Sequence, residues 1–308
     1  MSGPSDVEWP DPPLPPAEAT RPEAATRQAG DAKAFFAAIF SGNAEAYRRR
    51  LDALMERREA GGRQEVLDAI AARAGEHILD LACGPGTLTL PLAEAVGRSG
   101  EVIGVDLADG MLEQARAAVA GRHLSVRFLK MDMDVLQFPA GAFDGVTCGH
   151  GLHFVPNLGR VLREAHRVLK SKGRFAASVP LGNEPGVSAA EDALRMAIDN
   201  RLGDPPAHEA VAATRAVVFD PTRLQAACLA AGFRLANARR SEIDEHWTNA
   251  ETYVDAAFSW WSVATRLRGL SDHVRTLVRE EAIEAVAAVT KGAPFTVPNA
   301  SVVAVALA

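Results

Sequence analysis

Cysteine is scarce in this sequence, whose 308 residues include three: Cys83, Cys148 and Cys228. They stand far apart, without the Cys-x-x-Cys or histidine-rich spacing that is typical of zinc ligands. We therefore expect no metal site, and we expect all three thiols to stay reduced in a cytoplasmic protein.

Long apolar runs and dense basic runs are also missing. No stretch approaches the ~20 apolar residues of a membrane span, and residues 1–30 lack both the basic region and the apolar core of a secretory signal. The formal net charge is -6, so a polyanion would meet a mostly repulsive surface. We expect no nucleic-acid partner. The one basic cluster, Arg48-Arg49-Arg50, either touches an acidic acceptor or forms a solvated helix face.

The first 74 residues divide into a tail and a helical segment. Residues 1–30 are rich in proline, alanine and acid, which predicts a disordered tail. Residues 31–74 show helical patterning, with an apolar stripe at its start and two more helices over Ala44–Arg58 and Gln64–Arg73. We expect this segment to form an N-terminal helical cap.

Residues 75–308 alternate between apolar runs of strand length and amphipathic runs of helix length. Helices are expected from Leu88, Met111 and Leu158, and the expected strands lie near 76–82, 101–106, 124–130, 143–148, 173–179, 233–241 and 301–307. This alternation predicts an α/β fold with a doubly wound, mostly parallel, seven-stranded sheet covered on both faces. Right-handed crossovers place the carboxyl ends of the parallel strands along one rim, where we expect the functional residues.

Two insertions interrupt the alternation, at about 181–220 and 249–291, and we expect both to form helical lids beside that rim. The first contains an amphipathic helix over Ala189–Leu202. The second carries Phe258, Trp260 and Trp261, which either pave a cavity for a flat acceptor or pack between helices and in a homodimer contact.

The most informative segment is Ile78–Gly86, where an apolar run containing Asp80 ends at two glycines. A turn at Gly84 and Gly86 can bring main-chain N–H groups against a ligand. A second apolar run ends about twenty residues later in Asp106, whose carboxylate can accept both hydroxyl groups of a ribose. The sequence therefore predicts an adenosine site.

Three features favour an adenosine ligand without phosphates over a nicotinamide dinucleotide. Thr89 stands where the dinucleotide fingerprint has its third glycine. Asp80 would repel a pyrophosphate but suits a cationic ligand. Asp132, after a third apolar run, can accept a hydrogen bond from an exocyclic amino group, while Met133 offers its backbone N–H to the ring.

Residues from about Gly75 to Val179 resemble the class I S-adenosylmethionine-dependent methyltransferases, and within them the small-molecule group related to the ubiquinone and menaquinone C-methyltransferases. Six phrases carry the resemblance: Asp80–Gly86, Gly104-Val105-Asp106-Leu107 with Met111, Met131-Asp132-Met133, Phe143–Cys148, Gly151–Pro156 and Glu164–Lys170.

This resemblance implies a Rossmann-like methyltransferase fold and S-adenosylmethionine as the cofactor. The residues that it assigns to the cofactor are Asp80, Ala82, Gly84, Gly86 and the Gly149 carbonyl around the methionine part, Asp106 at the ribose, and Leu107, Met111, Asp132 and Met133 at the adenine. Tyr47 either leans toward the methionine part or simply packs.

Methyl transfer from a sulfonium asks little of side chains, because alignment of the reacting atoms supplies most of the acceleration. A base is needed only when the acceptor must lose a proton. His150 and His153, after the fourth strand, are the candidate catalytic residues, and lining the cavity wall is the alternative for both. Asp244 and His246 are weaker candidates from the far side of the cavity.

We expect transfer to a small organic acceptor in specialised metabolism, with oxygen favoured over carbon or nitrogen. A cyclase or a cofactor-dependent accessory protein is the alternative from another functional class.

Overall fold

One sheet of seven strands organises the computed structural model, which describes residues 23–204 and 209–308. The strands are β1 His77–Leu81, β2 Glu101–Asp106, β3 Val126–Lys130, β4 Phe143–Gly149, β5 Leu169–Leu181, β6 Leu235–Trp247 and β7 Phe295–Leu307. They lie in the order β3-β2-β1-β4-β5-β7-β6, with β1 to β5 parallel and β7 antiparallel to both of its neighbours. The predicted doubly wound, mostly parallel sheet is confirmed.

Helices cover both faces of the sheet, which is why its central strands read as nearly continuous apolar runs. Along β1, Ile78 packs on one face against α3 Gly62–Ile70 and α4 Thr89–Val96. Leu79 packs on the other face, in the core shared with α6 Leu158–Val168 and α9 Pro221–Ala230. The alternation follows from the two-residue period of a strand. Helix α5 Asp109–Val119 packs beside β3.

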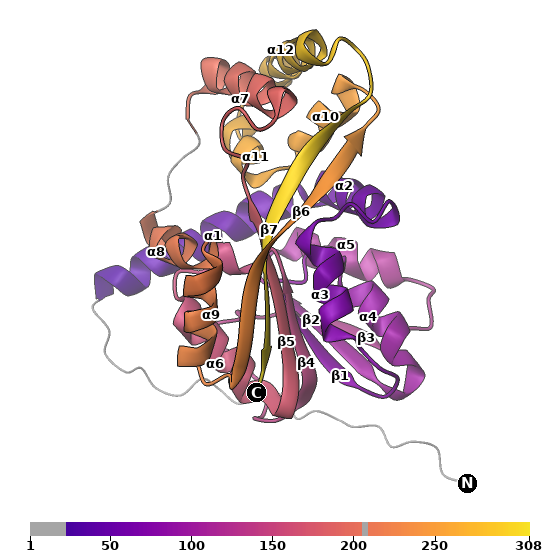
Figure 1. Ribbon diagram of the computed structural model, residues 1–308, viewed down its shortest axis with the longest axis vertical. Coiled ribbons are helices and arrows are strands. Elements are labelled where there is room, and N and C mark those ends of the chain that lie inside the picture. Colours follow the sequence, from indigo (N-terminus) through magenta and orange to yellow (C-terminus); the bar gives the residue numbers. More distant parts are fainter. Residues whose placement is uncertain (1–22, 205–208) are drawn as a thin grey trace.

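The last two strands are longer than the sequence predicts. Polar residues and Pro298 interrupt the apolar pattern beyond 233–241 and before 301–307, yet backbone pairing continues through Ile243 with Asn299 to Trp247 with Phe295. β6 and β7 therefore rise past the rest of the sheet as a two-stranded ribbon (Figure 1).

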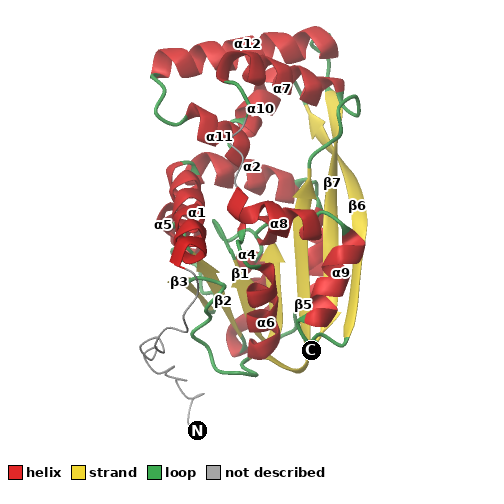
Figure 2. Cartoon of the chain, turned by 90° about the vertical axis from the view of Figure 1, so that its left-hand side faces the viewer, coloured by secondary structure: helices red, strands yellow, loops and turns green. Residues whose placement is uncertain are grey.

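A helical lobe gathers at the far end of this ribbon (Figures 1 and 2). It consists of α7 Ala189–Leu202, α10 Ala250–Ala257, α11 Trp261–Leu267 and α12 Asp272–Thr290. Ile198, Tyr253 and Val286 lie in its separate apolar core. The two insertions thus pack on each other. Residues 250–268 form two helices rather than one, because Trp260 adopts an extended conformation between them.

The two described helices of the first insertion lie in different parts of the molecule, with α7 in the helical lobe. The second helix of this insertion, α8 Glu209–Val218, was not predicted and lies away from the lobe, against η2 Leu152–Phe154, the short helix after β4. Within the described ranges, 23–204 and 209–308, no helix is both long and apolar enough to cross a bilayer.

The N-terminal helices cross between the sheet and the helical lobe (Figure 2). Helix α1 spans Glu23–Gly42 and α2 spans Ala44–Glu56. α1 thus begins inside the predicted tail, because residues 23–30 contain no proline and consist mainly of good helix formers such as alanine, glutamate, glutamine and arginine. The rest of that tail, residues 1–22, lies outside the described residues.

Candidate functional site

The glycine turn after β1 is tied to the end of β2 by Asp106. Its Oδ2 accepts the backbone N–H of Gly84 at 2.9 Å, and its Oδ1 accepts the N–H of Ala108 at 2.9 Å. Gly84 and Gly86 have φ values of +56° and +91°, which favour glycine. A Cβ on Gly84 would meet nothing within 4 Å, whereas one on Gly86 would lie 2.5 Å from Leu90 Cδ1. Gly84 thus faces open space and Gly86 faces the core.

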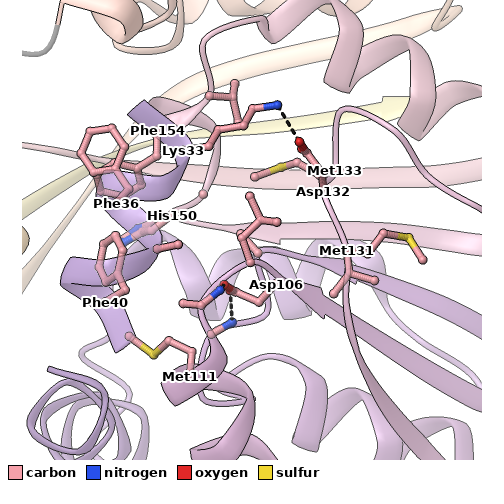
Figure 3. Close-up of a pocket in the computed structure, with 18 of the residues that line it drawn as sticks. Lys33, Phe36, Phe40, Asp106, Met111, Met131, Asp132, Met133, His150 and Phe154 are labelled. Atoms are coloured by element: carbon pink, nitrogen blue, oxygen red, sulfur yellow. Dashed lines mark hydrogen bonds and ion pairs between the residues drawn. The ribbon is translucent and has the colours of Figure 1, made fainter. Parts of the chain in front are cut away.

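A cavity of about 110 Å³, which we call the first cavity, opens on the side of the turn that Gly84 faces (Figure 3). The predicted residues that line it are Ala82, Gly84, Asp106, Leu107, Met111, Asp132, Met133, Gly149 and His150. Apart from Met111 on α5, they lie at or just after the ends of β1, β2, β3 and β4, as expected for the rim of a parallel sheet. Among the predicted residues, Asp80, Gly86 and His153 do not line this first cavity.

Helix α1 covers the first cavity. The sequence predicts a helical cap in this segment but does not assign any α1 side chain to the site. Lys33, Phe36 and Phe40 contribute to the wall. Lys33 Nζ lies 2.7 Å from Asp132 Oδ2 and 2.5 Å from Asp134 Oδ2, so an ion pair fastens the helix to the loop after β3. The pairing joins residues 99 positions apart, and nothing in the local pattern around Lys33 could have indicated it.

Gly110 sets how closely α1 approaches α5. A Cβ at this position would lie 2.4 Å from the backbone oxygen of Ser41, so alanine can be accommodated only if α1 moves. We expect Gly110→Ala to cost about 1–3 kcal/mol of packing and to speed hydrogen exchange of the α1 amides. Gly42→Ala is the matched control because its Cβ enters open space. Unchanged α1 protection in Gly110→Ala would contradict this account of the cap.

A smaller cavity of about 20 Å³ lies under the glycine turn, and Asp80, Gly149 and Thr87 contribute to its wall. Asp80 is 1% exposed and accepts hydrogen bonds from Thr89 Oγ1 at 2.6 Å and Thr147 Oγ1 at 2.8 Å. Burial raises the pKa of Asp80 to about 6. Thr87 Oγ1 is buried without a hydrogen-bond partner among the described residues. This third cavity therefore combines an acid with an unused hydroxyl group.

Arg63, which sequence reasoning did not single out, enters the same cavity from the first turn of α3. A Cβ on the preceding Gly62 would lie 2.7 Å from Ser178 Cβ, so the glycine lets α3 start directly against the sheet. Arg63 is 6% exposed. Its guanidinium donates to Tyr47 Oη at 2.8 Å and His150 Nδ1 at 2.7 Å. Within the described ranges no carboxylate pairs with it.

The second cavity is the largest of the three, at about 450 Å³, and lies between the sheet rim, α2 and the helical lobe. Trp260 and Trp261 line it, whereas Phe258 packs against the core of the lobe. Two of these three aromatic residues, Trp260 and Trp261, therefore line a cavity, as one of the two interpretations of the sequence expects. Of the basic cluster, Arg50 lines the cavity while Arg49 is exposed and pairs with Glu45.

The three cavities meet at Tyr47, which lines all of them. His150 and Phe154 belong to both the first and the second. Arg63 belongs to the second and the third. The Tyr47–Arg63–His150 hydrogen-bonded group therefore stands where a ligand in the first and third cavities would face a ligand in the second.

The two candidate histidines are poor proton acceptors in this arrangement. Arginine has only donors, so the Nδ1 lone pair of His150 is occupied by Arg63. Burial, together with the charge of Arg63, lowers the pKa of His150 well below its usual value. His153 lines the second cavity and is 3% exposed. Burial, and then the charge of Arg215, lowers its pKa to about 3.

The weaker candidates on β6 are wrong. Asp244 and His246 are exposed, and His246 Nδ1 lies 2.9 Å from Glu59 Oε1. The residue that lines the cavity is Glu245, because side chains alternate along the strand.

The three thiols lie in apolar surroundings. The three cysteines are free and buried, and burial raises the pKa values of Cys148 and Cys228 to about 12. Within residues 23–204 and 209–308, no group of three histidine, cysteine, aspartate or glutamate side chains is placed to hold a metal ion.

Comparisons with known proteins point to one family. A family model described as a methyltransferase domain matches residues 78–173. A demethylmenaquinone methyltransferase of Symbiobacterium thermophilum is 49% identical over 106 residues, which are 33% of this chain and 42% of that protein. The chain spans about half the length of the curated relatives of this kind that it matches. The nocamycin O-methyltransferase of Saccharothrix syringae is 30% identical over 247 residues, which are 76% of this chain and 85% of that protein.

Solved structures agree on the fold. A putative type II methyltransferase of Anaeromyxobacter dehalogenans matches with a TM-score of 0.53 and 23% identity, over 79% of this chain and 93% of its own. The YcgJ protein of Bacillus subtilis matches with a TM-score of 0.51 and 20% identity, over 80% and 97%.

Proposed function

Because this chain belongs to the class I S-adenosylmethionine-dependent methyltransferases, we propose that it transfers a methyl group from S-adenosylmethionine to an oxygen atom of a small organic acceptor. The observation that carries this proposal is the meeting of three cavities at Tyr47. The first and third cavities suit the two ends of the cofactor, and the second is a separate cavity large enough for an acceptor.

The first cavity suits adenosine. Each Asp106 oxygen accepts one backbone N–H and keeps a lone pair for a ribose hydroxyl. Met111 and Leu107 provide apolar surface for the adenine ring. Asp132 is shared with Lys33 but retains the capacity to accept from the exocyclic amino group.

The third cavity suits the charged end of methionine. Asp80 and the Gly149 carbonyl provide acceptors for an ammonium group, and Arg63 with the Thr87 hydroxyl provides donors for a carboxylate. The unpaired Arg63 is the strongest sign of fit, because a buried cation without an anion is costly. Gly86 supports the turn and has no contact with the ligand in this proposal.

Bound S-adenosylmethionine would supply an electrophilic methyl group on a sulfonium. The chain's own residues then hold the two ligands in line and exclude water. Because His150 and His153 both have lowered pKa values, neither is suited to take a proton near neutral pH. We assign His150 to orienting Arg63 and lining the acceptor cavity, and His153 to lining that cavity. We infer that the acceptor oxygen arrives already ionised.

We prefer oxygen over carbon as the acceptor atom because the similarity to an O-methyltransferase covers more of that relative than the similarity to the demethylmenaquinone methyltransferases covers of them. The matches to the demethylmenaquinone methyltransferases cover about half of those proteins. The match to the nocamycin O-methyltransferase covers 85% of that protein, which supports O-methylation in specialised metabolism. The homodimer stays a prediction.

The experiment is incubation with methyl-labelled S-adenosylmethionine and an extract of candidate metabolites. We expect S-adenosylhomocysteine together with an equal amount of methyl-labelled product whose new bond is to oxygen. A label on carbon or nitrogen would contradict the choice of atom. Conversion of an added metabolite without label transfer would contradict methylation itself and favour a cyclase or accessory role.

Affinity for S-adenosylhomocysteine should depend on pH through Asp80. In the free protein the raised pKa, about 6, leaves Asp80 ionised above pH 6 and protonated below it. An ammonium group favours the ionised carboxylate and lowers its pKa, so binding is strongest above pH 6 and is lost as the pH falls through it. We expect a loss of about tenfold between about pH 7 and about pH 5.

The control ligand is methylthioadenosine, which keeps the adenosine and lacks the ammonium. Its affinity should change little over the same range, and Asp80→Asn should remove most of the pH dependence seen with S-adenosylhomocysteine. An equal loss for both ligands would assign the titration to another group, such as Asp106.

A further inference from the structure

The wall of the second cavity carries more arginine than acid. Its arginines are Arg50, Arg63, Arg195, Arg215 and Arg266, and its acids are Glu191, Asp199 and Glu245. An interior surface with this excess of positive charge favours an anionic occupant. Which arginines are free to bind one depends on how each is paired.

Three of these arginines have carboxylate partners. Arg266 Nη1 lies 2.5 Å from Asp199 Oδ1. Arg50 Nη2 lies 3.9 Å from Glu245 Oε1, an ion pair without a hydrogen bond, and its Nε is buried without a partner among the described residues. Arg195 pairs with Asp192, just outside the cavity lining. Arg63 lacks such a partner but also borders the third cavity, where the proposed function gives it the methionine carboxylate. Arg215 is the arginine of this wall that has no carboxylate partner among the described residues and does not border the third cavity.

Arg215 is held in place without being neutralised. Its Nε donates to the backbone oxygen of His153 at 3.3 Å. The guanidinium carbon lies 4.7 Å from the ring centroid of Trp261 and 6.0 Å from that of Phe154. Nη2 is buried and has no hydrogen-bond partner, and no carboxylate pairs with Arg215 in residues 23–204 and 209–308. Aromatic contacts thus fix the orientation of the guanidinium at the cavity wall without giving Nη2 a hydrogen-bond acceptor.

His153 adds a second unused polar atom to the same wall. Its Nδ1 is buried and has no partner among the described residues, although its backbone oxygen contacts Arg215. The centroid of the His153 ring lies 3.9 Å from that of Phe154 and 6.1 Å from that of Phe219. Buried polar atoms are nearly always hydrogen-bonded. Four lining residues of this cavity carry an exception, at Arg50 Nε, His153 Nδ1, Arg215 Nη2 and Trp260 Nε1. The neighbouring pair at His153 and Arg215 points to a ligand at that part of the wall. A carboxylate matches the forked donors of arginine.

We propose that Arg215 is the anion-binding residue of the acceptor cavity, and that the acceptor is a flat, largely apolar molecule bearing a carboxylate or a similarly delocalised oxyanion. Trp261 and Phe154 would pack on its flat body while Arg215 fixes its charged end. Calling this ligand the methyl acceptor rests on the proposed function, whereas the binding itself does not.

The test compares matched pairs of probes that differ in charge and little in shape: benzoate with benzamide, and naphthoate with naphthamide. Binding is measured by equilibrium dialysis against the full-length protein, with and without S-adenosylhomocysteine. We expect naphthoate to bind at least about tenfold more tightly than naphthamide, as a charge-assisted hydrogen bond predicts. In Arg215→Gln this ratio should fall to about one, with naphthamide affinity nearly unchanged.

Two variants make the result specific. Arg215→Lys keeps the charge but loses the fork, and should retain only part of the preference for naphthoate. Arg223→Gln removes an exposed arginine on α9 and should leave the preference intact. Unchanged naphthamide binding serves as the check that the Arg215→Gln cavity is still folded.

Equal binding of naphthoate and naphthamide to the wild type, or a preference that survives in Arg215→Gln, would overturn the proposal. So would failure of naphthoate to bind at about 1 mM, an affinity that a single well-placed ion pair and an aromatic contact should reach. The proposed function fails separately, if S-adenosylhomocysteine does not bind while the naphthoate preference and its loss in Arg215→Gln persist.

Discussion

Replacing Asp106 by alanine is expected to weaken the binding of S-adenosylmethionine, S-adenosylhomocysteine and methylthioadenosine alike, by at least about 100-fold. All three ligands share the ribose, and a hydrogen bond to a charged group contributes about 1.5–3 kcal/mol. Two such bonds correspond to a factor of about 100 or more. The carboxylate also holds the N–H groups of Gly84 and Ala108, so its removal loosens the turn as well.

Asp109→Asn is the matched control for this experiment. Asp109 is an acid in the first turn of α5, but it is exposed and pairs with Lys130 on the surface. Isothermal titration should give wild-type affinity for Asp109→Asn, and thermal melting should show that Asp106→Ala is folded. Methylthioadenosine binding to a folded Asp106→Ala within about threefold of wild type would contradict the ribose role.

Replacing Arg63 by methionine is expected to separate two of these ligands. S-adenosylhomocysteine carries the amino and carboxylate groups of methionine, and its affinity should fall by about 10- to 100-fold, the range for a lost hydrogen bond to a charged group. Methylthioadenosine lacks both groups and should bind nearly as well as to the wild type. Asp106→Ala weakens both ligands, so the two variants map opposite ends of one site.

Methionine is chosen because it keeps the unbranched stem of arginine and removes the charge. It also leaves Tyr47 Oη and His150 Nδ1 without their donor, so some loss of stability is expected. Methylthioadenosine serves as the internal check, since its binding requires a folded adenosine site. Arg49→Met, on the exposed side of α2, should change neither affinity. Equal losses for both ligands in Arg63→Met would contradict a methionine carboxylate at Arg63.

The sheet and the rim of the site follow from the sequence because local patterns determine them. The apolar run of β1, the glycines after it and the acid at the end of β2 lie within one βαβ unit. The predicted fold is therefore confirmed, and most of the predicted cofactor residues line one cavity. Their individual roles stay predictions.

Lys33, Arg63 and Arg215 could not be predicted from the sequence because their partners are distant in it. Lys33 and Arg63 lie on helices ahead of the sheet, and Arg215 lies on a helix that the sequence did not predict. Each acquires its meaning from a contact made only in the folded chain. The histidines show the same limit: the position of His150 was predicted, but the Arg63 donor at its Nδ1 and its lowered pKa depend on packing.

The most direct test of the account is a calorimetric titration of the wild-type protein with S-adenosylmethionine, and separately with a nicotinamide dinucleotide. We expect saturable binding of one S-adenosylmethionine per chain, with a dissociation constant within the range of about 1 μM to 1 mM that is usual for enzyme ligands, and no binding of the dinucleotide. Saturable binding of the dinucleotide with no heat from S-adenosylmethionine would contradict it.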